Sequence, residues 1–344
     1  MSKRFLSSRI AKMLVGCGVV ALLLVSALLG FRLGSDAGVA EHQGTARSDI
    51  GRRNQTVDPH QRTTRRQSKF LVRGRSMLPT LSEGQVCDVM LSDQGTLPLR
   101  RGDLVAVRFA DGNHVKRLAG IPGDRIELQQ GRLSFNGNRL EDWIANATIA
   151  IPPAMVEVPS NPGDWRRSKE GSWIVYHHRD PYRDDQPGLV HDDYPMNVDV
   201  KRGLNPVDRL AIEFKSPSRR RVLFSIGGEV LATLGAGGTA RSRDGAPNLQ
   251  PDAKKAIPPE LTDVHPIAVE LTPGESINEL TQNLRVVREI EFRDDVRRRK
   301  ARYPIRLGAD QYFVLGDNVP VSVDSREIGP LPRSAILGRV VSCR

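Results

Sequence analysis

The sequence is poor in cysteine and in aromatic residues, and both shortages narrow the classes of protein to consider. Its 344 residues include three cysteines, Cys17, Cys87 and Cys343, and 5% aromatic residues. Cysteines at these separations form neither a metal-ligand spacing nor a dense disulfide framework, although a single bridge between Cys87 and Cys343 stays open. The net charge of +11 comes with no nucleic-acid-binding motif and no aromatics among the basic clusters, which favours a solvated or lipid-facing role over nucleic acid.

One hydrophobic run is long enough to cross a bilayer. It spans residues 13–31 and contains no charged residue. Basic residues precede it, so we expect a cytoplasmic N-terminus at 1–12 and a single-pass transmembrane anchor at 13–31 in the cell (inner) membrane. The rest of the chain would then lie on the outer, periplasmic face.

Two other N-terminal signals compete with this interpretation. A cleaved secretory signal ending near Ala40 is disfavoured because the apolar run is long. A lipoprotein signal at Cys17 is disfavoured because Arg9 and Lys12 interrupt the region that should be apolar. The basic stretch 32–69 has too few large apolar residues to fold alone, so we expect a polar tether there.

Short strand-like runs follow the tether, separated by Gly-Asp and Asn-Gly turns and by no long amphipathic helix. Strands joined in this way favour antiparallel pairing over a doubly wound architecture. The clearest runs lie at 84–91, 101–110, 113–121, 124–137 and 336–342. We therefore expect a mainly β fold, with an antiparallel β-sheet body at 70–140 and 303–344 and a large β-rich insertion at 141–302.

Two stretches place reactive side chains in restrained settings. In "RGRSMLPTL" a proline limits the backbone, so Ser76–Thr80 is predicted to form a rigid, extended turn that holds a hydroxyl steady; an ordinary loop or capping serine is the alternative.

In "NHVKRLAGIPGD" Lys116 shares a strand face with His114 and Leu118. Burial there would lower its pKa, whereas a surface lysine or one paired with a carboxylate would stay charged.

A third stretch, "YFVLGDNVPVSVDSREIGPLP", passes from an apolar strand into a dense set of polar residues. Ser322, Asp324 and Arg326 would alternate onto one face if the run is extended. Such density favours a hydrogen-bonded platform, although a charged surface hairpin would also explain it.

The motifs, in this order behind an N-terminal anchor, resemble the type I signal peptidases. These leader peptidases of family S26 are membrane-bound serine proteases that use a Ser-Lys dyad to remove signal peptides from exported proteins. The resemblance covers about 70–138 and 312–341 and leaves the middle of the chain unmatched. The residues that carry it are "SMLPTL", "GDLVAVR", "VKRLAGIPGD" and "GDNVPVSVDSREIGPLP".

The resemblance implies a role for each matching residue. Ser76 would be the nucleophile and Lys116 the general base of an acyl-enzyme mechanism. Ser322 would orient the lysine amine. Asp317 and Arg326 would form a buried ion pair that shapes the site, with Asp324 on the same platform. The pockets that select small residues in an Ala-x-Ala pattern would involve Val72, Met77, Leu81, His114 and Val115.

The resemblance also implies partners and exposes two departures from the family. It implies signal peptides of exported pre-proteins and the lipid bilayer as partners, allows contact with the export machinery, and implies no nucleic acid, metal or cofactor. Gly74 stands where some members carry a serine that donates to the oxyanion, so backbone N–H groups, including that of Ser76, would serve instead. Val319–Val321 replaces a more polar run. His114 is the alternative base.

The middle region carries little information about function. Its histidines and aspartates show no recurring ligand spacing, which favours a polar loop over a metal site. Substrate docking, partner binding and surface bulk all stay open for the insertion. Two alternative functions also stay open: an inactive membrane-tethered β scaffold that retains the motifs, and a self-cleaving Ser-Lys protease of the LexA type, which the anchor and the lack of a helix-turn-helix pattern disfavour.

Overall fold

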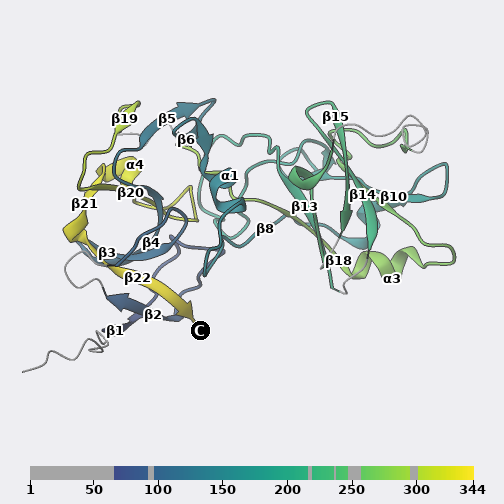
Figure 1. The fold of residues 1–344 in the computed structure, drawn as a ribbon. Helices are drawn as coiled ribbons and strands as arrows, with labels where there is room; N and C mark the ends of the chain where they lie inside the picture. Colours follow the sequence, from purple (N-terminus) through teal and green to yellow (C-terminus); the bar gives the residue numbers. More distant parts are fainter. Residues whose placement is uncertain (1–65, 92–96, 216–218, 236–237, 247–256, 295–300) are drawn as a thin grey trace, which may run out of the picture. The chain divides into compact units, whose positions relative to one another are not determined.

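The computed structural model describes residues 66–91, 97–215, 219–235, 238–246, 257–294 and 301–344 (Figure 1). The predicted transmembrane anchor at 13–31, the segment before it and most of the predicted tether lie outside these residues. Within the described ranges, no helix has both the length and the hydrophobicity to cross a bilayer. The described residues belong to one compact unit, Arg62–Arg344.

A seven-stranded antiparallel sheet carries the three motif stretches (Figure 1). Its strand order is β1-β2-β22-β3-β4-β20-β21. Four of the runs predicted as strands are β2, β3, β4 and β22, which confirms the mainly β, antiparallel expectation. The end of the predicted tether was wrong: Gln67–Lys69 belong to β1, whose residues pair with β2 along their whole length. The strands are β1 (Gln67–Leu71), β2 (Val86–Leu91), β3 (Leu104–Phe109), β4 (Gly112–Gly120), β20 (Gln311–Leu315), β21 (Leu331–Pro332) and β22 (Ile336–Cys343).

Both faces of this sheet are covered by apolar clusters. Along β3, Leu104 and Ala106 pack into one cluster, and Val105 and Val107 pack into the other. β4 lies between β3 and β20, so its side chains are buried on either face. This arrangement explains how two adjacent cations on β4 come to lie inside the protein.

A smaller sheet continues the body, with the order β19-β5-β6-β7. The run predicted at 124–137 divides into β5 (Arg125–Gln129) and β6 (Arg132–Phe135), joined by a turn in which Gly131 has φ +79°. Ile126, Phe135 and Phe313 share the apolar cluster beside it. The remaining elements here are β7 (Asn138–Arg139), α1 (Leu140–Ala145) and β19 (Ile305–Arg306).

Two antiparallel sheets of the middle region share a core, and β11 and β12 form a separate two-stranded sheet. One has the order β15-β14-β17-β10-β9 and the other β16-β13-β18-β8. Along β10, Ile174 and Tyr176 face this shared core, whereas Trp173 and Val175 face a second cluster on the other side. The strands are β8 (Val156–Glu157), β9 (Trp165–Arg167), β10 (Trp173–Tyr176), β11 (Arg179–Asp180), β12 (Gln186–Pro187), β13 (Leu210–Phe214), β14 (Arg220–Ile226), β15 (Glu229–Gly235), β16 (Thr239–Arg241), β17 (Ile267–Glu270) and β18 (Leu284–Arg288).

The helices in the described residues have six residues or fewer, as the lack of a long amphipathic pattern predicted. Besides α1 they are α3 (Ile277–Gln282), α4 (Ser325–Ile328), η1 (Pro162–Asp164), η2 (Ser242–Asp244) and η3 (Arg333–Ala335).

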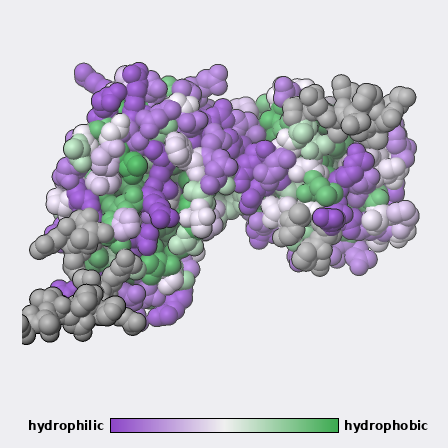
Figure 2. Space-filling model, in the orientation of Figure 1, coloured by the Kyte–Doolittle hydropathy of each residue, from purple (hydrophilic) through white to green (hydrophobic). Residues whose placement is uncertain are grey.

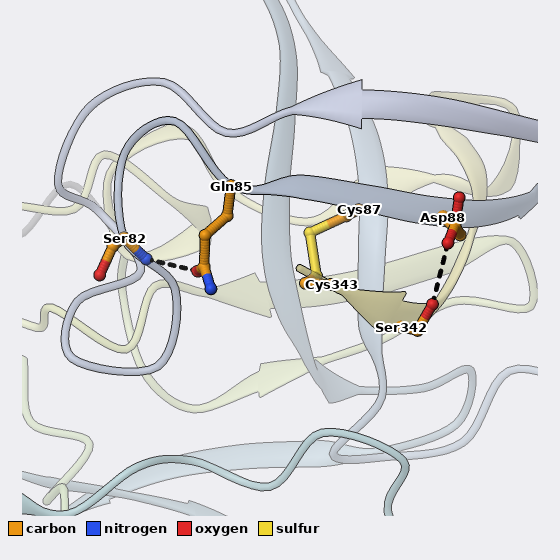
Figure 3. Close-up of a disulfide and its surroundings, with 6 residues drawn as sticks. All are labelled: Ser82, Gln85, Cys87, Asp88, Ser342 and Cys343. Atoms are coloured by element: carbon orange, nitrogen blue, oxygen red, sulfur yellow. Dashed lines mark hydrogen bonds between the residues drawn. A yellow bond between two sulfur atoms is a disulfide. The ribbon is translucent and has the colours of Figure 1, made fainter.

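A disulfide joins Cys87 on β2 to Cys343 on β22 (Figure 3). The two cysteines are directly opposite each other in the antiparallel pair, and a hydrogen bond of 3.0 Å from Ser342 Oγ to Asp88 Oδ2 lies beside them. The bridge that the sequence left open is therefore present.

Candidate active site

Ser76 lies in a compact turn between β1 and β2. Hydrogen bonds from the Leu78 N–H to the Arg75 C=O (3.1 Å) and from the Leu81 N–H to the Met77 C=O (2.9 Å) close this turn. The predicted turn at Ser76–Thr80 is present, but its predicted extended backbone was wrong, because the chain folds back on itself there. Ser76 is partly exposed, whereas the Met77 side chain is buried in the core. The buried methionine anchors the turn, and the serine remains accessible to solvent.

Lys116 lies on β4, an interior strand of the seven-stranded sheet, and is only 1% exposed. Its Nζ donates a hydrogen bond of 2.9 Å to Ser322 Oγ and lies 6.0 Å from the centre of the Phe109 ring. Burial lowers the pKa of Lys116 to about 8, and the Asp324 carboxylate opposes this shift. A neutral amine is therefore accessible near physiological pH.

Gly316 brings the serine turn and Ser322 together. A side chain at this position would lie 2.1 Å from Ser322 Oγ and 2.5 Å from the Ser76 carbonyl oxygen. Both groups therefore occupy the space that a Cβ of the residue after β20 would fill, and only glycine leaves enough room.

The ion pairs differ from the one that the resemblance implied. Asp317 accepts hydrogen bonds of 2.7 and 2.6 Å from Nε and Nη2 of Arg117, and both side chains are fully buried. The predicted pairing of Asp317 with Arg326 was therefore wrong. Because Arg117 follows Lys116 on β4, it points to the opposite face of the strand, where it meets Asp317 and the Gly102 carbonyl.

Arg326 pairs instead with Asp324. Its Nη2 and Nε donate bonds of 2.7 and 2.9 Å to the two carboxylate oxygens. Burial disfavours ionisation of Asp324, but the Arg326 guanidinium outweighs this effect and lowers the carboxyl pKa. Asp324 also caps α4, so the run is not extended and the condition under which Ser322, Asp324 and Arg326 would share one strand face is not met. The short helix folds Arg326 back onto its partner.

A cavity of about 590 Å³ lies beside Ser76. Four of the predicted pocket residues line it together with the serine: Val72, Met77, His114 and Val115. Leu81 packs instead in the apolar cluster that contains Cys87 and Val340. The structure therefore brings most of the predicted substrate-binding residues to one cavity and places Leu81 in the core.

His114 makes its contacts away from the serine turn. Its Nε2 lies 2.8 Å from Asp111 Oδ1, and its ring lies 4.8 Å from that of Phe109. Among the described residues, no hydrogen bond joins His114 to Ser76. The geometry gives the histidine a place in the cavity wall.

The histidines of the middle region have partners of other kinds. His178 Nδ1 lies 3.1 Å from Tyr176 Oη, and the centre of the His177 ring lies 4.0 Å from that of His265, with the rings tilted by 44°. Asp192 accepts hydrogen bonds from the backbone and side chain of Asn205. These contacts are internal to the fold of the middle region.

Sequence reasoning missed three residues of this site. Arg117 neutralises Asp317, Thr80 Oγ1 donates to the same carboxylate, and Asn318 donates its backbone N–H to the Ser76 carbonyl at 3.0 Å. An arginine within an apolar strand was the available signal for Arg117, since a buried cation requires a partner. The asparagine of the "GDN" motif was the signal for Asn318.

The fold and the site together define a β-sheet protein in which a buried lysine binds one serine, and this serine and a turn carrying a second serine lie against one glycine. The profile of signal peptidases, peptidase S26, matches residues 63–169 and 269–343, which is more than half of the chain. The chain therefore belongs to the signal peptidase family, peptidase S26.

Individual relatives agree with this assignment. Signal peptidase I of Bacillus caldolyticus is 34% identical over 76 residues, which make up 22% of this chain and 42% of the relative. Signal peptidase I S of Bacillus subtilis is 33% identical over 73 residues, covering 21% and 40%. Signal peptidase IB of Staphylococcus aureus is 31% identical over 81 residues, covering 23% and 42%. The chain thus matches about two fifths of the length of each relative.

Proposed function

We propose that this protein is a membrane-bound serine endopeptidase that removes signal peptides from exported pre-proteins after small residues, in an Ala-x-Ala pattern. Family membership supports the reaction class. The observation that carries the proposal is the buried hydrogen bond of 2.9 Å from Lys116 Nζ to Ser322 Oγ, in a site where the pKa of the lysine falls to about 8.

In the proposed mechanism, neutral Lys116 accepts the proton of Ser76 Oγ. The serine oxygen attacks the carbonyl carbon at the cleavage point, and the C–N bond breaks as the amine leaves with a proton. Water then hydrolyses the acyl-enzyme to release the signal peptide and regenerate Ser76. Ser322 holds the amine in place during these steps.

Backbone N–H groups would bind the developing oxyanion. Gly74 has φ +74° and provides no side-chain donor. Among the described residues, the Ser76 N–H has no hydrogen-bond acceptor, so it is free to bind a substrate oxygen. A donor of this kind typically lowers the barrier by several kcal/mol.

The cavity beside Ser76 supports the preference for small residues. Val72, Met77 and Val115 are buried side chains that line it, and they are fixed by the surrounding core. A rigid wall of apolar side chains excludes large residues sterically. Leu81 would act behind this wall by supporting Val72 and Met77.

The proposed location is the cell (inner) membrane, with residues 1–12 in the cytoplasm, 13–31 as the anchor and the catalytic β domain on the periplasmic face. The Cys87–Cys343 disulfide supports this side of the membrane, because such bridges persist in oxidising compartments. Figure 2 shows hydrophobic residues at the surface over the seven-stranded sheet, which is compatible with contact with a bilayer. The remaining proposed partners are signal peptides and the export machinery.

The test is cleavage of a synthetic signal peptide ending in Ala-x-Ala by the detergent-purified full chain, with products identified by mass. We expect a cut after the final alanine. Ser76→Ala and Lys116→Ala should each lower the rate by at least about 10³-fold, because each removes a reacting group. Lys169→Ala, which removes an exposed lysine of the middle region, is the matched control and should retain the activity of the parent.

Each contrary result would favour a different function or mechanism for this protein. A folded parent chain that cuts nothing would favour the inactive scaffold. Cleavage only of its own chain would favour a self-cleaving protease. Activity that survives in Lys116→Ala and disappears in His114→Ala would identify the histidine as the base.

A further inference from the structure

One turn of the middle region contacts the loop after β20, next to the proposed catalytic residues, although it lies between the two segments that match the family. Tyr194 to Asn197 form a β-turn closed by a hydrogen bond of 2.8 Å from the Asn197 N–H to the Tyr194 C=O. The residues at both ends of the turn are buried, with Tyr194 3% and Asn197 7% exposed. Their side chains contact Asp317 and Asn318, the two residues that follow Gly316.

Asn318 links both serines of the site. Its backbone N–H donates to the Ser76 carbonyl at 3.0 Å, and its Nδ2 donates to the Arg75 carbonyl at 2.9 Å. Its own carbonyl accepts the Ser322 N–H at 3.0 Å. A movement of Asn318 would therefore displace the nucleophile turn and the serine that binds Lys116 together.

Asn197 fixes the orientation of the Asn318 side chain. Asn197 Nδ2 donates to Asn318 Oδ1 at 2.7 Å, and Asn318 Nδ2 donates to Asn197 Oδ1 at 3.1 Å. Two opposed amide bonds determine which edge of the Asn318 amide carries the donor, and hence that Nδ2 faces the Arg75 carbonyl. Because Asn318 is fully buried, solvent does not replace these bonds when they are lost.

A second bond from the same turn holds the same loop. Tyr194 Oη donates to the Asp317 carbonyl at 3.1 Å, next to the ion pair between Asp317 and Arg117. The turn thus contacts two consecutive residues of the loop after β20.

We propose that Asn197 is a positioning residue for the reaction: it acts through Asn318 to hold Ser76 and Ser322 in register with Lys116. The inference rests on the proposed function for its kinetic consequence. Asn197 does not line the cavity beside Ser76, so it affects the reacting geometry and leaves substrate affinity unchanged.

The test compares Asn197→Ala with Asn283→Ala in the full chain. Asn283, which follows the last residue of α3, is the matched control. Its Nδ2 donates to the Glu279 carbonyl within α3, and its side chain has no hydrogen bond to a residue of the site among the described residues. With the synthetic signal peptide, Asn197→Ala should lower kcat by about 10- to 100-fold with KM within about twofold, since small misplacements of reacting groups are costly. Asn283→Ala should match the parent chain.

A double variant tests whether Asn197 acts through Asn318. Asn197→Ala combined with Asn318→Ala should be no slower than Asn318→Ala alone. Multiplicative losses in kcat would overturn the proposal, and so would equal activity of Asn197→Ala and Asn283→Ala. If Asn197→Ala does not fold, Tyr194→Phe serves in its place; an unchanged kcat in that variant would count against positioning by the turn.

Amide hydrogen exchange separates this inference from the proposed function. Asn197→Ala should exchange faster than the parent in peptides covering 72–82 and 316–324, and Asn283→Ala should not. If the parent chain cuts nothing yet this difference appears, the positioning role stands and the proposed function fails. Identical exchange in all three chains would overturn the positioning role.

Discussion

At the scale of single residues, the proposed chemistry depends on how Lys116 is surrounded. Burial disfavours its charged form, while the Asp324 carboxylate favours it and the Arg326 guanidinium disfavours it. Because Arg326 binds both oxygens of Asp324, most of that negative charge is compensated locally. Desolvation therefore dominates, and the pKa of the lysine falls to about 8.

This environment predicts how the rate depends on pH. Only the neutral amine accepts a proton, so with a pKa of about 8 roughly a tenth of the enzyme is competent at pH 7 and about nine tenths at pH 9. We expect kcat/KM to rise by about tenfold over this interval. The measurement is the rate of peptide cleavage at half-unit steps of pH.

His114→Ala serves as the control for this profile, because a histidine base would also titrate near neutrality. The pH profile of the variant should have the same shape and midpoint as that of the parent chain. A flat rate between pH 7 and pH 9, or a curve that moves in His114→Ala, would contradict the assignment of the base.

At the scale of elements, α1 is joined to the end of the middle region by a buried carboxyl. Glu141 Oε1 accepts the Phe292 N–H at 2.9 Å, and within the described residues its Oε2 has no hydrogen-bond partner. Burial raises the pKa of Glu141 to about 7, although the backbone N–H donors and Arg132 oppose the shift. The helix is therefore anchored by a group whose neutral form is favoured.

Glu141→Gln should make the free energy of unfolding less dependent on pH. A carboxyl whose pKa is raised in the folded state holds its proton there while the unfolded chain releases it, so stability falls between about pH 4.5 and about pH 7. Glutamine retains the acceptor for Phe292 and does not ionise. Relative to the parent chain, the variant should gain about 1–3 kcal/mol on going from pH 4.5 to pH 8.

Urea unfolding at the two pH values measures this gain. Glu170→Gln removes an exposed carboxylate and is the control; its difference from the parent should be the same at both pH values. An equal difference for Glu141→Gln would show that Glu141 is not the titrating group.

At the scale of the whole molecule, two strands from opposite ends of the described chain are cross-linked. Cys87 and Cys343 are 256 residues apart in sequence and lie opposite each other on β2 and β22 (Figure 3). The bridge closes a loop that includes β3, β4, β20 and the entire middle region. The bridge thereby lowers the conformational entropy of the unfolded chain over the residues that form this sheet, including Ser76 and Lys116.

Removing the disulfide should destabilise the protein. We expect the double substitution Cys87→Ala with Cys343→Ala to lower the free energy of unfolding by about 2–5 kcal/mol, because the unfolded chain regains conformational entropy. The measurement is urea unfolding with and without a thiol reductant.

The reductant provides the internal control. It should destabilise the parent chain and leave the double variant unchanged. Equal stability of the oxidised parent and the variant would mean that β2 and β22 hold together without the bridge.

The motif stretches show how much of the site could be predicted from sequence. Ser76, Lys116 and Ser322 were identified together, and the structure places Lys116 on Ser322 and both serines against Gly316. The catalytic roles of these residues stay predictions. The partners of the charged groups could not be predicted, because Arg117 and Asp317 are 200 positions apart and meet only where β4 pairs with β20.

The sequence by itself determined the strands β2, β3, β4 and β22 and the mainly β, antiparallel class, since alternating apolar residues and glycine-containing turns are local properties of the chain. It also determined the chemical groups of the site. Only the tertiary structure decided that Asp324 pairs with Arg326, that Cys87 faces Cys343, and that Asn197 reaches Asn318. Such contacts depend on strand register and on the path of long connections, which no local pattern specifies.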